Sequence, residues 1–321
     1  MKKFFLFLTL TLLFTSCSKR SEPSKERTMK YSDVSVPQFS GNQAFQYLVD
    51  QTNFGPRNPN SIGHTECLAF LQGEFLRYAD SLQLQTFDIT GYNNVMLHLT
   101  NVIAHFNIKS QRRILLSAHW DTRPRADHEK GGPVDKPILG ANDGASGVAV
   151  LLEIARNLKN SPPPIGVDII LWDGEDYGRE GDLNNYFLGS KYWAATKPYS
   201  YQPLFAVNLD MVGDKQLTLP KEGFSVQYAP DVVNLVWNTA AELGVSQFVD
   251  RVGDEVYDDH LQLDNIGIKA IDIIDFAYPD ATNKYWHTLE DTPDKCSPES
   301  LAAVGKVLLQ VIYKKVSLLS Q

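Results

Sequence analysis

Apolar runs and apolar residues at helical spacing alternate along most of the chain. The runs at 113–118 and 167–172 are typical of strands that are buried on both faces of a sheet. Between them, residues 145–158 are apolar every three or four positions, which predicts an amphipathic helix. A strand, a helix and a second strand in this order predict a βαβ crossover with two parallel strands.

The same patterns predict the other elements of the chain. Further helices are predicted over residues 40–52, 64–82, 188–196, 232–243 and 297–319. Further strands are predicted over residues 84–89, 95–106, 204–209 and 268–274, with a strand pair within 215–227. We therefore expect one globular α/β domain over residues 38–321, with a mixed, mostly parallel central sheet flanked by helices.

Carboxylates and imidazoles stand where the predicted parallel strands end. His119 and Asp121 follow the first strand of the crossover, and Glu175 and Asp176 follow the second. Asp143 lies immediately before the crossover helix. Because the carboxyl ends of parallel strands open into one crevice, we expect these five side chains to share one rim of the sheet. Such a cluster is hard to explain as solvated surface and is typical of a metal site.

Two residues farther along the chain extend this cluster. Asp210 ends a later predicted strand, and His287 closes a polar loop near the C-terminus. Together with Asp143 and Asp176, His287 would offer zinc two carboxylates and one imidazole and leave a coordination position open. His119 and Asp210 could complete a second site that Asp143 bridges.

Two other acidic residues of the cluster suggest chemistry beyond metal binding. Glu175 is adjacent to Asp176 but is not needed as a ligand, and such a carboxylate is the expected general base or acid. Asp121 could orient the His119 imidazole from behind. The loop 123–139 is too long to be a simple connection and is expected to be functional or flexible.

The motifs in this order resemble those of a known enzyme family. They are His119-x-Asp121, Gly140-Ala-x-Asp143, Asp173-Gly-Glu-Asp176, Asp210 at a strand end and Trp286-His-Thr288. Over about residues 40–320 the chain resembles the zinc exopeptidases of family M28, and most closely its glutaminyl-peptide cyclotransferase branch. Three segments favour that branch: Phe54–Arg57 is similar to its early Gly-Pro-Arg loop, Asp258–His260 to its Asp-Asp-His segment, and Trp286-His287 to its Trp-His pair.

This resemblance implies a zinc exopeptidase-like fold and one catalytic zinc ion, with two ions as an alternative. The implied zinc ligands are Asp143, Asp176 and His287. Glu175 would be the proton shuttle, and Asp210 and Asp258 would form a proton relay beside it. Trp286 would be a wall of the substrate pocket. His119 would be either a remnant of the two-metal peptidases or a ligand of a second ion.

Three positions depart from the pattern of the animal cyclases. Asp176 stands where they carry Glu, Gly181 where they carry a second pocket Trp, and Asp272 where they place a pocket His. Asp is one methylene shorter than Glu but can still bind zinc. Tyr177 or Tyr186 could supply the missing aromatic wall. These differences bear on which substrates the pocket prefers.

Three functions compete for this sequence. The first is a glutaminyl-peptide cyclotransferase, which converts N-terminal glutamine to pyroglutamate and releases ammonia. The second is a zinc aminopeptidase of the same fold, which would activate water with one or two metal ions; the presence of His119 and Asp210 favours it. The third is a binding protein without activity, which is disfavoured because no candidate ligand is missing.

The N-terminus and the charge of the chain indicate where the protein acts. Lys2, Lys3 and the apolar residues 4–14 resemble the signal peptide of a bacterial lipoprotein, with Cys17 as the lipidated residue of a signal spanning 1–17. Ordinary secretion is the alternative, and 18–37 would be a flexible tether. A net charge of −8 without a basic patch argues against nucleic-acid binding. We expect a monomeric enzyme of the cell envelope whose substrates are peptides or proteins with N-terminal glutamine.

Four residues outside the cluster have more than one interpretation. Arg57 is more consistent with a buried anchor than with a substrate contact, and His128 is expected to be solvated. Cys67 and Cys296 could pair in an exported protein, but two cysteines define no framework.

Overall fold

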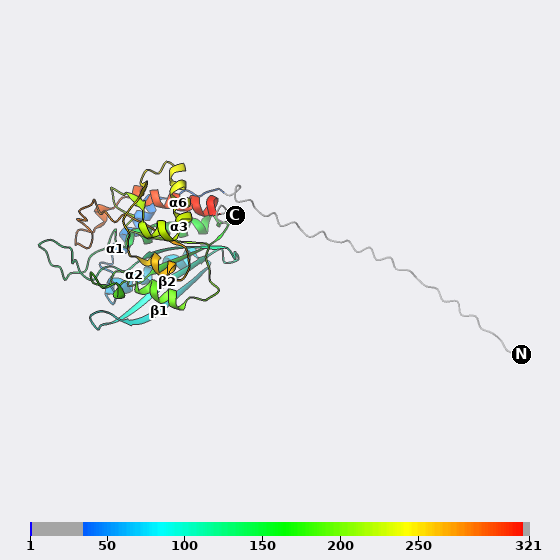
Figure 1. Cartoon of the computed structure of the whole chain (residues 1–321). Coiled ribbons are helices and arrows are strands. Elements are labelled where there is room, and N and C mark those ends of the chain that lie inside the picture. Colours follow the sequence, from blue (N-terminus) through cyan, green and yellow to red (C-terminus); the bar gives the residue numbers. More distant parts are fainter. Residues whose placement is uncertain (2–34, 317–321) are drawn as a thin grey trace.

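The computed structural model describes Met1 and residues 35–316 of the chain (Figure 1). The predicted signal peptide and nearly all of the predicted tether lie outside the described residues, apart from Met1 and residues 35–37. Among the helices of the described part, none is long and apolar enough to cross a membrane.

A six-stranded mixed sheet forms the centre of the domain, in the order β1-β2-β4-β3-β5-β8. Its strands are β1 (Ser81–Thr90), β2 (Met96–Phe106), β3 (Arg113–His119), β4 (Gly166–Trp172), β5 (Ala206–Asp210) and β8 (Ala270–Ile274). The antiparallel hairpin of β1 and β2 forms one edge, and β4, β3, β5 and β8 run parallel to one another. The predicted α/β class and the βαβ crossover from β3 to β4 are confirmed.

Helices cover both faces of this sheet (Figure 1). The larger core lies under α1 (Gly41–Thr52), α2 (Ile62–Tyr78), α3 (Ala145–Asn160), α6 (Pro230–Glu242) and α8 (Pro298–Gln310). The smaller core lies under α4 (Leu188–Thr196) and α7 (Asp259–Asp264). Alternate residues of β4 serve the two cores, because Ile169 and Leu171 join the larger one while Ile170 and Trp172 join the smaller one.

One predicted strand pair is wrong. Residues 215–227 contain the short strand β6 (Leu219–Lys221) and then the helix α5 (Gly223–Tyr228), and β6 pairs with β7 (Phe248–Val252) instead. Glu222 starts the helix, because its carboxylate accepts hydrogen bonds from the first backbone amides of α5. At the C-terminus, α8 passes into a wider π-helical turn over Val311–Lys315.

Two open questions from the sequence are resolved by the fold. Arg57 is fully buried and donates hydrogen bonds of 2.7–3.2 Å to three backbone carbonyls within 120–140, so it is an anchor for the segment that leads into the candidate site. Cys67 and Cys296 are both buried free thiols and form no disulfide with each other.

Candidate active site

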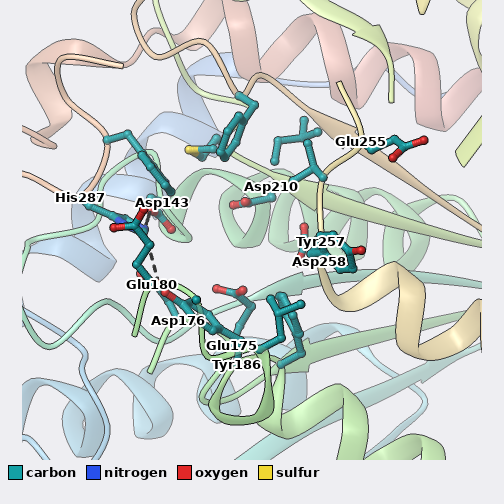
Figure 2. A pocket seen from close by; sticks show the side chains of 18 residues that line it. Asp143, Glu175, Asp176, Glu180, Tyr186, Asp210, Glu255, Tyr257, Asp258 and His287 are labelled. Carbon is teal, nitrogen blue, oxygen red and sulfur yellow. Dashed lines mark ion pairs between the residues drawn. The ribbon is translucent and has the colours of Figure 1, made fainter. Parts of the chain in front are cut away.

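A pocket of about 300 Å³ opens at the C-terminal ends of the parallel strands (Figure 2). The strand ends that were predicted to share one rim therefore do so. The pocket is lined by all but two of the predicted site residues, namely Asp143, Glu175, Asp176, Asp210, Asp258, Trp286 and His287; His119 and Asp121 are buried and do not line it. The His119 side chain is almost completely buried beside three of them.

Asp143, Asp176 and His287 form the first candidate metal group (Figure 2). Nε2 of His287 lies 3.4 Å from Oδ2 of Asp143 and 3.4 Å from Oδ1 of Asp176. The other carboxylate oxygen of Asp176, Oδ2, is buried without a hydrogen-bond partner among the described residues. Two carboxylates and an imidazole that converge in this way are a donor set that suits zinc. The residues present therefore fit the ion that the sequence implies.

His119, Asp143 and Asp210 form a second candidate metal group that shares one carboxylate with the first. Nε2 of His119 lies 3.2 Å from Oδ1 of Asp143 and 3.2 Å from Oδ1 of Asp210. Gly144 makes room for this ring, because a Cβ at that position would lie 2.5 Å from Cε1 of His119. The described residues thus offer ligand atoms at two adjacent positions.

Asp121 supports the turn that carries Glu175 and Asp176. Its two carboxylate oxygens accept the backbone N–H groups of Glu175 at 3.0 Å and of Asp176 at 3.3 Å. Its Oδ1 lies 3.6 Å from Nδ1 of His119, which is too long for a good hydrogen bond. The hydrogen bonds of Asp121 therefore position the turn, whereas we expected them to orient the imidazole.

Burial controls the charge of the acidic residues in the pocket. It raises the pKa of Glu175 well above its usual value and raises the pKa of Asp210 to about 7. Burial acts in the same direction on Asp176, but the adjacent His287 and Arg123 outweigh it and hold the pKa of that carboxyl below its usual value. A divalent cation among these groups would favour the charged form of each carboxylate.

Arg123 and Asp127 stand behind the first metal group, and both come from the long loop 123–139. Arg123 donates hydrogen bonds to Asp176 at 2.6 Å and to the two oxygens of Asp127 at 2.6 and 2.7 Å. Asp127 Oδ1 in turn lies 3.9 Å from Nδ1 of His287. The length of the loop suggested a role, but no pattern along the chain pointed to either residue.

Asp291 supports Asp143 and was also missed from the sequence. Its carboxylate accepts the backbone N–H groups of Asn142 at 2.8 Å and of Asp143 at 3.2 Å, as well as the hydroxyl of Tyr278 at 2.9 Å. The one available signal was its place four residues after His287.

Aromatic side chains form the walls of the pocket. Trp286 is half-buried and stacks on His287 with a distance of 3.9 Å between the ring centroids, so it belongs to the pocket and not to the core. Of the two candidates for the second aromatic wall, Tyr186 lines the pocket beside Gly181, whereas Tyr177 is buried away from it.

Three further residues clarify the surroundings of the pocket. Asp258 lines the pocket and also caps the N-terminus of α7. Asp272 is fully buried behind it and does not line the pocket; both carboxylates accept hydrogen bonds from Asn208. The expectation that His128 is solvated is wrong, because it is only partly exposed and packs edge-on against Trp286 with 4.5 Å between the ring centroids.

The backbone of the pocket is strained at three positions. Phe187, Met211 and His287 line the pocket and have φ angles of 59°, 46° and 55°. Every other non-glycine residue with positive φ in the described part of the chain is Asn, which tolerates this conformation better than other side chains do. Strain of this kind concentrates at functional sites, which supports a function for this pocket.

Comparisons with known proteins agree with this geometry. The sequence model of Peptidase family M28 matches residues 101–312. The crystal structure of a Bacteroides thetaiotaomicron glutaminyl cyclase bound to N-acetylhistamine is similar at 40% sequence identity, with a TM-score of 0.83 over 87% of this chain and 99% of that chain. A Zn-dependent exopeptidase from Parabacteroides distasonis is similar at 36% identity, with the same TM-score of 0.83 and the same coverages of 87% and 99%. The Bos taurus glutaminyl-peptide cyclotransferase is 21% identical over 272 residues, which cover 74% of this chain and 70% of that protein.

Proposed function

This chain belongs to peptidase family M28, and we propose that it is a zinc-dependent glutaminyl-peptide cyclotransferase. Such an enzyme converts an N-terminal glutamine to pyroglutamate and releases ammonia. The observation that carries the proposal is the pocket, in which Glu175 lies beside a three-ligand group and Trp286 forms a wall. The similarity to a bacterial glutaminyl cyclase over 87% of the chain supports the same function.

The pocket is suited to an intramolecular reaction. The α-amine of the bound glutamine attacks the side-chain amide carbon, and the C–N bond to the amide nitrogen breaks. The products are a five-membered lactam and free ammonia. Walls such as Trp286 and Tyr186 would hold the side chain folded, so that the two reacting groups meet without a water nucleophile. Zinc bound by Asp143, Asp176 and His287 would act as a Lewis acid on the amide carbonyl.

Glu175 is the residue that we propose to move the proton. It lines the pocket next to Asp176 and is not a member of the three-ligand group. In the proposed reaction its carboxylate takes a proton from the attacking amine and gives it to the leaving nitrogen. Asp210 and Asp258 line the same pocket and would act as a relay that holds this proton between the two transfers.

An aminopeptidase of the same family is the second candidate function. The observation that favours it is the group of His119, Asp143 and Asp210, because a second ion bridged by Asp143 could activate a water molecule for peptide hydrolysis. The two candidates therefore differ in the number of metal ions and in the products.

The proposal extends to the setting of the enzyme. Its substrates would be peptides or proteins that begin with glutamine, and nucleic acids would not be partners. The features of residues 1–17 support export to the bacterial cell envelope with a lipid anchor at Cys17, and we propose a monomer.

A paired assay tests the proposed reaction. The purified protein is incubated with a glutamine-initiated peptide, and pyroglutamate formation and ammonia release are followed; a panel of aminoacyl substrates is incubated in parallel. We expect pyroglutamate and ammonia with no free amino acids from the panel. Release of free amino acids without pyroglutamate would replace the cyclase with the aminopeptidase.

A further inference from the structure

We propose that Arg123 is a positioning residue that sets the orientation of Asp176 and, through Asp127, the tautomer of His287. The inference rests on the proposed metal site, but it concerns a residue outside the ligand set and outside the proton relay. One planar guanidinium group connects two of the three ligands, and it lies on a loop whose role the sequence left open.

The surroundings of Arg123 satisfy all of its hydrogen-bonding capacity. Its side chain is only 1% exposed. Nη1 donates to Oδ1 of Asp176 at 2.6 Å and to the backbone oxygen of the same residue at 3.4 Å. Nε and Nη2 donate to the two oxygens of Asp127 at 2.6 and 2.7 Å, and Nη2 also donates to the Tyr186 hydroxyl at 3.0 Å. A guanidinium has five N–H donors, and here each has an acceptor.

The bond to Asp176 decides which oxygen of that carboxylate is free. Arg123 occupies Oδ1, while Oδ2 is buried and has no hydrogen-bond partner among the described residues. Oδ1 is also the Asp176 oxygen that lies 3.4 Å from Nε2 of His287, so a carboxylate held in this way faces the other ligands in one orientation. Arg123 therefore limits the rotation that an unsupported Asp176 would have.

The bond to Asp127 acts on the His287 imidazole. Nε2 is the ring nitrogen between the two ligand carboxylates, so Nδ1 must carry the proton when Nε2 binds a metal ion. Nδ1 is buried without a hydrogen-bond partner in the described structure, and Oδ1 of Asp127 is 3.9 Å away. That distance is too long for a hydrogen bond, but the negative charge of a carboxylate fixed there by Arg123 favours the proton on Nδ1 and leaves Nε2 free to bind.

Lysine could not replace this residue without loss. Its ammonium is a compact charge that cannot reach Asp176, Asp127 and Tyr186 in one plane. We therefore test Arg123→Lys, which keeps the positive charge but removes the fork. The matched control is Arg113→Lys, because Arg113 also pairs with both oxygens of a buried carboxylate, Asp168, but lies at the opposite end of β3.

The measurement is the zinc affinity of the purified full-length variants, by competition with a chromogenic chelator. We expect Arg123→Lys to bind zinc roughly 10–100-fold more weakly than the wild type, as is typical when a partner behind a ligand is lost. Arg113→Lys should bind zinc with an affinity within about twofold of the wild type, even if its melting temperature falls. Sites this far apart are usually not energetically coupled. With Co²⁺ in place of zinc, the visible absorption bands should shift in Arg123→Lys alone.

Several outcomes would overturn the inference. The inference fails if a folded Arg123→Lys variant binds zinc with wild-type affinity. It also fails if Arg113→Lys loses as much zinc affinity as Arg123→Lys, because the loss would then reflect lower overall stability. If Arg123→Lys does not fold, Asp127→Asn replaces it, and unchanged zinc affinity in that variant overturns the role of the Asp127 bridge. Failure of the wild type to bind zinc would overturn the proposed function and this inference together, whereas the other outcomes leave the proposed function in place.

Discussion

The two candidate metal groups that meet at Asp143 differ in how their other members are held. In the group with Asp176 and His287, a separate pair of residues, Arg123 and Asp127, lies behind the ligands. In the other group, Nε2 of His119 is hydrogen-bonded to Asp210 itself at 3.2 Å. The first group is thus supported from outside, whereas the members of the second support each other.

This difference separates a ligand set from a metal site. Three donors within reach of one point are common near acidic clusters, but a metal ion also requires that each donor be oriented by a neighbour. Asp291 fixes the backbone of the shared Asp143, whereas Arg123 fixes Asp176, which belongs to the first group alone. In the second group, a second ion would have to replace the hydrogen bond between His119 and Asp210. We therefore expect one zinc ion, bound by the first group.

The largest effect is expected where the two groups overlap. Asp143→Ala removes a ligand from both, so zinc content should fall to background, and activity should fall by more than the ~100-fold that follows loss of a residue behind a ligand. Elemental analysis of the purified variant checks this. Asp88→Ala is the control, because that side chain is 63% exposed on β1. Full zinc content in Asp143→Ala would remove this residue from the ligand set.

The next effect separates proton transfer from metal binding. Glu175→Gln keeps the shape of the side chain but cannot accept the proton, so turnover should fall by roughly 10²–10⁴-fold while zinc content stays at the wild-type value. Steady-state kinetics and metal analysis on the same sample test both parts. Glu180 lines the same pocket, and the control variant Glu180→Gln should change turnover little. Undiminished activity in Glu175→Gln would contradict the assigned base.

A smaller effect tests whether the second group holds an ion. His119→Asn removes the hydrogen bond to Asp210. Because Asp210 is a charged acceptor, we expect turnover to fall about tenfold. It should leave zinc at one equivalent per chain, and one equivalent should reactivate chelator-treated wild-type protein. Two equivalents in the wild type and one in the variant would reverse the comparison and favour the aminopeptidase.

The first group could be predicted from the sequence, and its support could not. Asp176 stands four residues after the end of the 167–172 apolar run, so parallel topology alone brought it to the rim. Arg123 and Asp127 lie on a loop, and no periodicity encodes the path that returns a loop to a particular ligand. His119 and Asp210 were placed correctly too, but their mutual hydrogen bond depends on side-chain orientation.

The wrong strand pair has a similar physical cause. Apolar residues such as Leu217 and Leu219 alternate with polar ones, which is typical of a strand. The structure instead ends β6 at Lys221, since the buried Glu222 carboxylate accepts the amides of Phe224 and Ser225 at 2.8 and 2.6 Å and starts α5. An alternation of apolar and polar residues over a few positions does not reveal such a capping hydrogen bond.

The smallest effect is expected at Tyr186, which contacts Arg123 behind the first metal group. Tyr186→Phe keeps the aromatic wall but removes the hydroxyl that accepts a hydrogen bond from Arg123 at 3.0 Å. The guanidinium would still be held by Asp176 and Asp127, so zinc affinity should weaken by no more than about threefold, the lower end of what one hydrogen bond contributes.

Tyr177→Phe is the matched control for that variant. Its hydroxyl donates to Asn93 at 2.9 Å, and it is the aromatic candidate that the fold places outside the pocket. Zinc competition and KM for a glutamine-initiated peptide should both remain at wild-type values in this control. A loss of zinc affinity in Tyr186→Phe as large as in Arg123→Lys would mean that the hydroxyl, and not the guanidinium fork, orients the ligands. The ligands of the first group would then be oriented by Tyr186, which also lines the substrate pocket. Binding of substrate and binding of metal would therefore be coupled.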